Sequence, residues 1–482
     1  MSGIIGIAKP RQGRLVREAL GRIAHRGGAG TLVRSRSRAT LGWTWPQAQT
    51  PMAIGADRHQ VVLDGEIHNW PELAPGATCA LEALQQAYRN RGPEFVAHVD
   101  GPFALALAGP AGLFLARDFV GKSPLYLAWC QGTLCFGSEI KALLGIAEHI
   151  KEFPPGHYWQ PGEGLVPFAR IQPGPALQQP AQELATALCG RLVSSVRKRL
   201  ATGEVGAWLS GGLDSAAMVA LARRQQPTLH TFSVGLEGAP DLGCARAVAD
   251  FVGADHHERV CTLEELIAVL PTVIYHLESF DALLVRSSVM NFLVAELAAH
   301  HVSAVLSGEG GDELLAGYSY LKRLRRDALP AELTDITGRL HNTALQRVDR
   351  CSASHGLVAR TAFLDREVVD FALRIPPEYK IRRRGRPVEK WILRVTLDGL
   401  LPEEIVWRPK SKFWEGSGIG DLLAAHAEDA ISDSEFEREH TLPGGLQLHT
   451  KEELFYYRIF REQLGDQLDP AIVGRTRTAT PA

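Results

Sequence analysis

At 482 residues the chain is longer than one ordinary domain, and we expect two or three. A hydrophobic content of 45% and a mean hydropathy of −0.06 are typical of a soluble protein with a large core. A net charge of −2 argues against nucleic acid or an anionic membrane as a partner. The seven scattered cysteines include no Cys-x-x-Cys pair, and no apolar run approaches the ~20 residues of a membrane span. We therefore expect reduced thiols and a cytoplasmic location.

Residues 1–172 show short alternating apolar segments separated by Gly and Pro. Strands are predicted in "GIIGIAK", "QVVLDGEI", "PFALALAG", "LFLARD" and "LCFGS", and helices in "RLVREALGRIAHR" and "CALEALQQAYRNRG". Such a pattern favours a layered antiparallel domain.

The pattern changes after a Pro- and Gln-rich stretch, which we interpret as a linker over 173–183. From 184 to 463, apolar strands followed by glycine loops alternate with helical spacing, as in "EVGAWLSGGLDSAAMVALARRQ". This alternation predicts an α/β domain with a parallel sheet. Residues 464–482 lack a core-forming pattern and are predicted to form a mobile tail.

The string "LSGGLDS" (209–215) follows an apolar strand and begins a helix. Its small residues let backbone N–H groups converge on an anion, and the helix N-terminus adds partial positive charge. The string is neither a Walker loop nor a Gly-x-Gly-x-x-Gly motif. The alternative to an anion-binding loop is an ordinary tight turn. Asp214 stands where a carboxylate can hold Mg²⁺ against phosphates.

A second string, "LSGEGGDELLAGY" (306–318), repeats the arrangement of strand and glycine loop. Asp312 is the candidate second Mg²⁺ ligand, because two metal-holding carboxylates suit chemistry at a pyrophosphate. The alternative for Asp312 and Glu313 is a pair of acidic residues at a helix N-terminus.

These strings resemble the PP-loop of the ATP pyrophosphatases, and the whole chain resembles glutamine-dependent asparagine synthetases together with the β-lactam and carbapenam synthetases. Further similar strings occur in the same order: "GSEIKALL", "IKEFPPGHYW", "FSVGLEGAPDL", "FLDREVVDFAL", "PVEKWILR" and "LPEEIVWRPKSKF". The resemblance implies an N-terminal Ntn-hydrolase-like αββα domain and a C-terminal PP-loop α/β domain that adenylates a carboxylate. It leaves a homodimer open.

Residue by residue, the resemblance implies roles for the matched positions. Lys390 and Lys410 would face the phosphates, where fixed cations stabilise developing charge; a solvated surface charge is the alternative for each. Asp214 and Asp312 would bind Mg²⁺. The ATP-binding positions would be Leu209, Ser210, Gly211, Gly212, Leu213, Asp214, Ser215, Val234, Ser307 and Gly308.

The acceptor pocket departs from the family. Asparagine synthetases have two threonines where this chain has Leu283 and Leu284, and Arg286 is retained as a candidate catalytic residue at the substrate. Losing two hydroxyls disfavours a small polar amino acid, although the leucines also suit a buried core. An acidic residue thought to deprotonate the incoming nitrogen is here Val358. His355 is a candidate base near neutral pH, with a structural histidine as the alternative.

The N-terminal pocket departs more. The nucleophilic Cys of the family's glutaminase is here Ser2, an Asn is Asp64, an Asp is Thr78, and "LGWTWPQAQ" lacks the family's Arg. Serine is a weaker nucleophile without activation. We therefore expect a glutaminase domain that does not bind or cleave glutamine.

The sequence thus predicts an ATP- and Mg²⁺-dependent ligase that joins a small-molecule carboxylate to ammonia or an amine without glutamine, in specialised metabolism. Alternatives are intramolecular amide closure of the β-lactam type, which "WEGSG" (414–418) favours, asparagine synthetase proper, and a non-catalytic scaffold. A PP-loop enzyme acting on RNA is disfavoured by the neutral charge.

Overall fold

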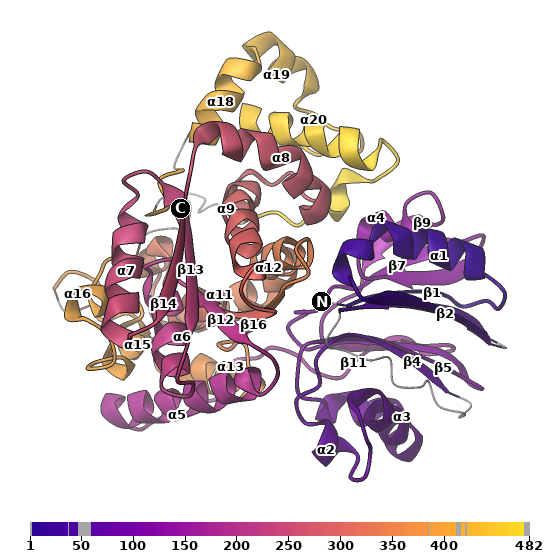
Figure 1. Cartoon of the computed structure of the whole chain (residues 1–482), viewed down its shortest axis with the longest axis horizontal. Helices are drawn as coiled ribbons and strands as arrows, with labels where there is room; N and C mark the ends of the chain where they lie inside the picture. The colour runs from indigo at the N-terminus through magenta and orange to yellow at the C-terminus, as the bar shows by residue number, and fades with distance from the viewer. Residues whose placement is uncertain are drawn as a thin grey trace. The chain divides into compact units, whose positions relative to one another are not determined.

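The computed structural model describes residues 2–36, 38–46, 59–383, 385–410, 416–419 and 422–476. The chain divides into two compact units, one built mainly from residues 1–170 and the other mainly from 171–482 (Figure 1). The stretches Ala353–Gly356 and Leu464–Ile472 group with the first unit. Between β11, which ends at Pro167, and α5, which begins at Ala181, the chain forms no helix or strand. The linker predicted over 173–183 lies here except for its last three residues, which form the start of α5.

The first unit contains two antiparallel sheets. The first sheet has the order β2-β3-β1-β8-β7-β9 and the second the order β11-β10-β6-β5-β4. The first sheet comprises β1 (Gly3–Ile7), β2 (Gly30–Arg36), β3 (Ala39–Trp45), β7 (Tyr126–Cys130), β8 (Thr133–Gly137) and β9 (Glu148–Glu152). The second comprises β4 (Gln60–Gly65), β5 (Phe103–Gly109), β6 (Gly112–Arg117), β10 (His157–Gln160) and β11 (Gly164–Pro167).

Helices cover both sheets of this unit. Figure 1 shows α1 (Gly13–Arg22) and α4 (Ile140–Leu143) over the first sheet, and α2 (Trp70–Leu73) and α3 (Ala80–Arg91) over the second. Ile4 and Phe136 of one sheet pack with Leu115 of the other in the core between the sheets. A second core joins the opposite face of the second sheet to Leu84 of α3. The predicted αββα layering is confirmed.

The second unit is built on one parallel sheet of order β14-β13-β12-β15-β16. Its strands are β12 (Val205–Trp208), β13 (His230–Leu236), β14 (Asp255–Cys261), β15 (Ala304–Ser307) and β16 (Val358–Thr361). The strand order reverses between β12 and β15, and the loops that leave neighbouring strands at such a point form a crevice at their carboxyl ends. Both glycine strings leave from this point.

The helices of the second unit come before, between and after these strands in the sequence. They are α5 (Ala181–Leu200), α6 (Leu213–Arg223), α7 (Pro240–Val252), α8 (Leu263–Leu277), α9 (Ala282–Ala299), α10 (Gly311–Leu315), α11 (Leu329–Gly338), α12 (Ala344–Ala353), α13 (Arg366–Arg374), α14 (Pro377–Lys380), α15 (Trp391–Thr396), α16 (Glu403–Val406), α18 (Leu422–Ala430), α19 (Asp433–Glu439) and α20 (Lys451–Leu464). The predicted α/β domain with a parallel sheet is confirmed.

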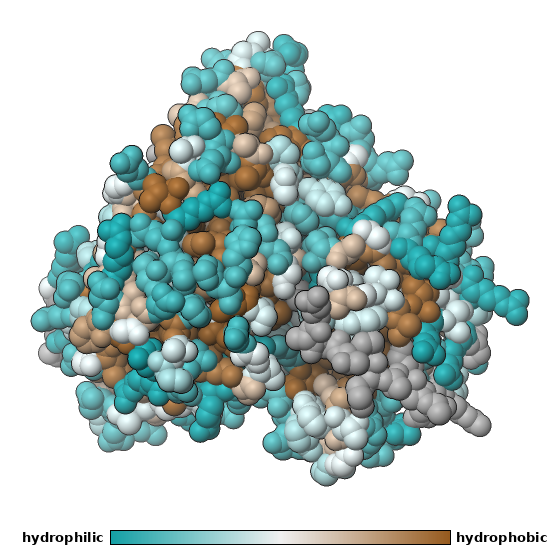
Figure 2. Space-filling model, viewed as in Figure 1, coloured by the Kyte–Doolittle hydropathy of each residue, from teal (hydrophilic) through white to brown (hydrophobic). Residues whose placement is uncertain are grey.

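Among the described residues, α9 alone has the length and hydropathy of a membrane span, but 78% of it is buried inside the protein, as in a core helix. Polar residues cover most of the visible surface, with apolar residues showing through in patches (Figure 2). Such patches are normal, because a folded protein has too little polar surface to cover itself.

Part of the predicted tail is held in place. Arg475 pairs with Glu453 at 2.5 Å, and the backbone N–H and hydroxyl of Thr476 both donate to Asp281. Residues 477–482 of that tail lie outside the described residues.

Candidate active site

The loop after β12 is closed by its own serine. The Ser215 hydroxyl accepts a hydrogen bond from the Ser210 backbone N–H and donates to the Gly212 carbonyl. Gly211 has a φ of +69°, and a Cβ there would lie 2.5 Å from the Asp241 carbonyl oxygen, so only glycine fits. The loop ends at Gly212, the N-cap of α6. A short chain segment is thus fixed beside a helix N-terminus, where an anion can bind.

Two aspartates from the two glycine strings meet at one lysine. The Lys390 Nζ lies 2.5 Å from Asp214 Oδ2 and also pairs with Asp312 Oδ1. Lys410 reaches Asp312 Oδ2 at 2.9 Å. The four predicted residues Asp214, Asp312, Lys390 and Lys410 therefore form one cluster.

Lys390 is held in an unusual conformation. It is 1% exposed, and its φ of +51° places a non-glycine residue in the left-handed region at the N-cap of α15. Such backbone strain is retained where the surrounding structure fixes it, and it concentrates at functional sites.

Glycines bring the backbone close to the two carboxylates. A Cβ on Gly311 would lie 2.6 Å from the Asp214 carboxylate, one on Gly308 would lie 2.9 Å from the Ser215 nitrogen, and one on Gly317 would overlap Asp312 Oδ1. No larger residue can stand at these positions unless the carboxylates or the backbone move.

The two aspartates differ in their protonation equilibria. Burial alone would raise the pKa of Asp312, but Lys390 and Lys410 outweigh burial and hold this pKa below its usual range. At Asp214, burial outweighs the attraction of Lys390 and raises the pKa, with a further contribution from Asp312. The same two carboxylates outweigh the burial of Lys410 and raise its pKa, so its positive charge is fixed.

Asp214 Oδ1 is buried and has no hydrogen-bond partner among the described residues. A buried carboxylate oxygen without a partner is costly unless a ligand satisfies it. Because Mg²⁺ prefers carboxylate oxygens plus phosphate oxygens and water, Asp214 and Asp312 fit this ion. Mg²⁺ held there would supply neutralisation of phosphate charge.

A pocket opens beside this cluster. It is lined by Ser210, Gly212, Leu213, Asp241, Lys390, Arg394, Arg408, Pro409 and Lys410. Three charged residues of this lining were not among the site residues predicted from the sequence: Asp241, Arg394 and Arg408. Arg408 donates to the Gly211 carbonyl at 2.9 Å and pairs with Asp241 at 2.7 Å, so it ties the loop to α7.

Glu389 contacts residues next to the cluster and helps to hold them in place. It pairs with Arg394 at 2.7 Å and with Lys322 at 2.5 Å, and it accepts from the Lys410 backbone N–H at 3.0 Å. The local sequence gives little sign of this role, because Glu389 directly precedes Lys390 and could as well have been a surface charge.

Other predicted nucleotide-binding positions lie near the same crevice. Ser307 ends β15 and Gly308 follows it, while Val234 is buried in β13. Leu209 is fully buried and its N–H donates to the Phe232 carbonyl, so its backbone extends the sheet toward the loop.

Arg286 and His355 are not among the residues that line this pocket. Arg286, in α9, forms a buried bidentate pair with Glu452 of α20 at 2.7 and 2.6 Å, and the Tyr456 hydroxyl donates to the same carboxylate. His355 follows α12 in the stretch that groups with the first unit.

The structure also places the residues that are predicted from the sequence to form the acceptor pocket. Leu283 and Leu284 occupy the first turn of α9, where Asp281 caps the helix and Leu284 is 4% exposed. Val358 begins β16 at the amino end of the sheet, opposite Ala304. In "WEGSG", positions 414 and 415 lie outside the described residues.

The first unit contains a second buried charged cluster, around Ser2. The Ser2 hydroxyl donates to Asp64 Oδ1 at 3.4 Å, and its carbonyl accepts from Arg26 at 2.7 Å. Arg26 is fully buried and pairs with Asp64 at 3.1 Å and with Glu139 at 2.8 Å. Ser138 donates to the second Asp64 oxygen at 2.9 Å. Asp64 is therefore engaged within the protein.

Thr78, the other substituted position in the first unit, is exposed. Its backbone N–H and hydroxyl both donate to Glu82 of α3, at 2.8 and 2.7 Å. Residues 47–58, which include the end of the string that lacks the family's Arg, lie outside the described residues.

The chain joins an αββα unit to a parallel α/β unit. In the second unit, the glycine loops and the lysine–carboxylate cluster lie where the strand order reverses. This combination defines a two-part ligase of the PP-loop type. The asparagine synthase family model matches residues 187–335 and 325–480, and the glutamine amidotransferase domain model matches residues 1–153.

Relatives match along most of the chain. Asparagine synthetase [glutamine-hydrolyzing] of Sandersonia aurantiaca is 35% identical over 85% of this chain and 84% of its own. Asparagine synthetase [glutamine-hydrolyzing] 2 of Arabidopsis thaliana is 34% identical over 83% of this chain and 75% of its own. The chain belongs to the asparagine synthase family, and it is an ATP-dependent carbon–nitrogen ligase of the asparagine synthetase type.

Proposed function

We propose that this enzyme adenylates a carboxylate larger or less polar than aspartate and joins it to ammonia or to an amine without using glutamine. The observation that carries the proposal is the Ser2–Asp64–Arg26 cluster in the first unit. The relatives are named as glutamine-hydrolysing, so this proposal sets the chain apart from them.

The cluster disfavours glutamine hydrolysis for two reasons. Serine needs an activating base to act as a nucleophile, and Asp64, its partner, is already neutralised by Arg26. The Asp64 oxygens are taken up by Arg26, Ser138 and Ser2, so this carboxylate has little capacity left to orient a substrate amide.

In the second unit, the described side chains suit adenylation. The loop backbone and the α6 N-terminus would hold the ATP phosphates, while Lys390 and Lys410 would stabilise charge as the substrate carboxylate attacks the α-phosphorus and pyrophosphate leaves. The nitrogen nucleophile would then attack the acyl carbon and release AMP. Asp214 and Asp312 are assigned to Mg²⁺.

The choice of carboxylate rests on Leu283 and Leu284. Apolar side chains at the start of α9 remove hydroxyl partners that a small polar acceptor would use, which favours substrates of specialised metabolism over aspartate. A non-catalytic scaffold would have no need for a buried lysine–carboxylate cluster of this kind, because burying charges is costly.

The test is pyrophosphate release from ATP over a panel of carboxylates, with ammonia, amines or glutamine as the nitrogen source. We expect at least one carboxylate other than aspartate to react with ammonia or an amine, and no glutamate to form from glutamine. Reaction without any added nitrogen source would favour intramolecular closure. Preference for aspartate with glutamine would refute the proposal.

Three single variants and one double variant extend this test. Ser2→Cys restores the nucleophile and Asp64→Asn restores the amide, and we expect neither the single nor the double variant to hydrolyse glutamine, because other binding positions also differ. Asp214→Asn should lower pyrophosphate release at least about 100-fold while the first unit stays unchanged. Ammonia-dependent activity that survives Asp214→Asn would contradict the assigned site.

A further inference from the structure

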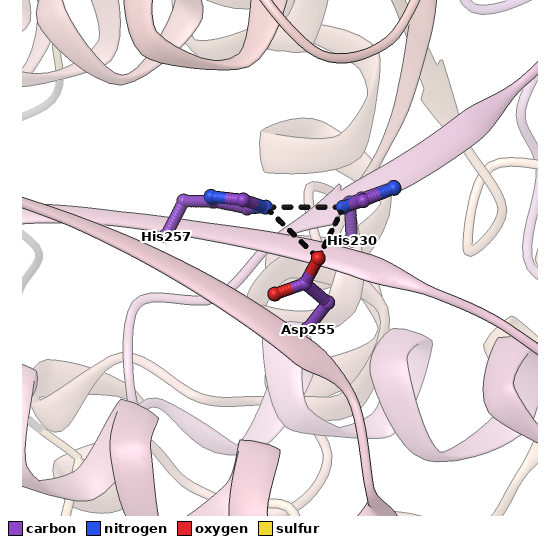
Figure 3. Close-up of side chains that lie close together, drawn as sticks. All are labelled: His230, Asp255 and His257. Carbon is purple, nitrogen blue, oxygen red and sulfur yellow. Dashed lines mark hydrogen bonds and ion pairs between the residues drawn. The ribbon is translucent and has the colours of Figure 1, made fainter.

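Three metal-ligating side chains converge on one face of the parallel sheet in the second unit. His230 begins β13, Asp255 begins β14 and His257 lies two residues further along β14. The register pairs His230 with Asp255 and Phe232 with His257, which places all three side chains on one face. Figure 3 shows both rings and the carboxylate pointing toward a common centre.

The three ligand atoms form a small triangle. His230 Nδ1 lies 3.0 Å from His257 Nε2 and 3.1 Å from Asp255 Oδ2, and His257 Nε2 lies 3.5 Å from the same oxygen (Figure 3). Ligand atoms bound tetrahedrally to Zn²⁺ at about 2.0–2.1 Å lie about 3.3 Å from one another. The spacing therefore suits three ligands of one ion.

Hydrogen bonds among the two ring nitrogens and the carboxylate oxygen cannot make all three contacts favourable. Each ring nitrogen either carries a proton or accepts one, and the ionised carboxylate only accepts. If both nitrogens donate to Asp255, two N–H groups face each other at 3.0 Å. If only one donates, a lone pair of the other faces the carboxylate. A cation at the centre satisfies all three contacts together.

The surroundings hold the His257 ring in place and leave the site open to solvent. The His301 ring centre lies 3.9 Å from that of His257, and Phe232 stacks on His257 at 5.2 Å, which fixes the ring orientation. The Asp255 side chain is 62% exposed, so an ion can enter from solvent.

The cluster lies away from the candidate active site. His230 and Asp255 stand at the amino ends of their strands, whereas the glycine loops leave the carboxyl ends of β12 and β15. Because the strands are parallel, the amino ends and the carboxyl ends lie at opposite ends of the sheet. An ion here would join the edge strand β14 to β13 and would take no part in adenylation.

We propose that His230, Asp255 and His257 form a divalent transition-metal site of the two-histidine, one-carboxylate class, with Zn²⁺ as its probe ion. Imidazole donors suit Zn²⁺, Ni²⁺ and Cu²⁺, whereas Mg²⁺ and Ca²⁺ prefer oxygen alone. Three protein ligands leave the remaining coordination positions to solvent.

The test uses the tag-free full chain after removal of metals by chelation. Calorimetric titration with Zn²⁺ should show one ion bound per chain, an excess of Mg²⁺ should not displace it, and Co²⁺ should give visible absorption typical of nitrogen and oxygen ligands. Zn²⁺ should also raise the melting temperature.

Single variants then assign the ligands. His230→Gln and His257→Gln should each weaken Zn²⁺ binding at least about tenfold, and Asp255→Asn should weaken it as well. His300→Gln is the matched control, because His300 is exposed and lies outside the cluster. Circular dichroism and ATP-dependent pyrophosphate release report whether each variant is folded.

Wild-type protein that binds no Zn²⁺ at micromolar concentrations would overturn the proposal. Equal Zn²⁺ affinity in wild type and folded His257→Gln would also overturn it. Because the readout is metal binding, failure here leaves the proposed ligase function standing, and an inactive ligase leaves this site standing.

Discussion

Lys390 Nζ lies 2.5 Å from Asp214 Oδ2, although 176 residues separate the two in the chain. The lysine is held by a left-handed backbone conformation at the start of α15, and the aspartate by the first turn of α6. Two elements of the α/β unit therefore have to be assembled before the charge cluster exists.

The close approach of Gly311 to Asp214 can be tested without removing a charge. Gly311→Ala should place a methyl group 2.6 Å from the Asp214 carboxylate. The methyl group should displace this carboxylate and thereby lower pyrophosphate release. Gly190→Ala is the matched control, since a Cβ at that position in α5 meets nothing within 4 Å and alanine favours a helix by about 0.5–1 kcal/mol. Equal activity in the two variants would contradict the geometry described for the cluster.

The pair of Arg286 and Glu452 is predicted to contribute to stability. Arg286→Met leaves a buried carboxylate without its guanidinium, which should lower the free energy of unfolding by about 3–5 kcal/mol. The double variant Arg286→Met/Glu452→Gln removes the unpaired charge and keeps an acceptor for Tyr456, so it should recover most of this loss. Urea unfolding measures both.

Kinetics separate this structural role from the substrate-binding role predicted from the sequence. If Arg286 only holds α20 against α9, the folded double variant should keep the KM for the carboxylate substrate. A KM raised tenfold or more in that variant would place Arg286 at the substrate instead.

Glu313 should make stability depend on pH. Burial, with Asp312 and Glu309 nearby, raises its pKa to about 7 from an ordinary 4.5. The folded state thus binds the proton more tightly, so the contribution to stability is full below pH 4.5 and is lost as pH rises through about 7. The loss amounts to about 3 kcal/mol.

Glu313→Gln keeps an acceptor for the Tyr318 hydroxyl and removes the titration. The free energy of unfolding of wild type relative to this variant should therefore fall between pH 4.5 and 7, as measured by urea titration at several pH values. Glu404 is exposed, and Glu404→Gln is the control. This variant should show the same dependence of the free energy of unfolding on pH as the wild type. A parallel pH dependence in wild type and Glu313→Gln would show that Glu313 titrates normally.

Lys380 should have the opposite pH dependence. Burial lowers its pKa to about 7 from 10.5, so the unfolded state binds the proton more tightly, and stability rises as pH rises from 7 to 10.5. Lys380→Met should abolish this slope and stabilise the protein at pH 7 by at most about 5 kcal/mol. Lys451→Met, at a surface ion pair, should change little. A destabilised Lys380→Met at pH 7 would refute the prediction.

Strands with a buried apolar face could be predicted from the sequence, and polar ones could not. The segment "PFALALAG" corresponds to β5, whose seven residues are buried except at the end. β2 and β14 carry charged and exposed side chains, and their apolar period is too weak to recognise. These two strands lie at sheet edges, where only one neighbour and little core constrain the sequence.

The candidate site was predictable to the extent that its residues lie in recognisable strings. Asp214 and Asp312 each follow a strand and a glycine loop, so a parallel sheet brings them together. Glu389 and Arg26 carry no such signal, because burial of a charge depends on partners distant in the chain: Glu139 is 113 residues from Arg26. The resemblance to the family supplied Lys390 and Lys410, which spacing alone would not have identified.

The edge strand β14 has a consequence for association between copies of this protein. An unpaired strand edge exposes backbone groups on which another strand can add, and charged side chains along it discourage this. Arg246 holds Glu258 in a bidentate pair, and Arg259 reaches Glu296 at 2.6 Å, so two paired charges directly precede the exposed Val260. Replacing Glu258 and Arg259 with apolar β-branched residues would remove this protection and turn an isolated edge into a template for aggregation.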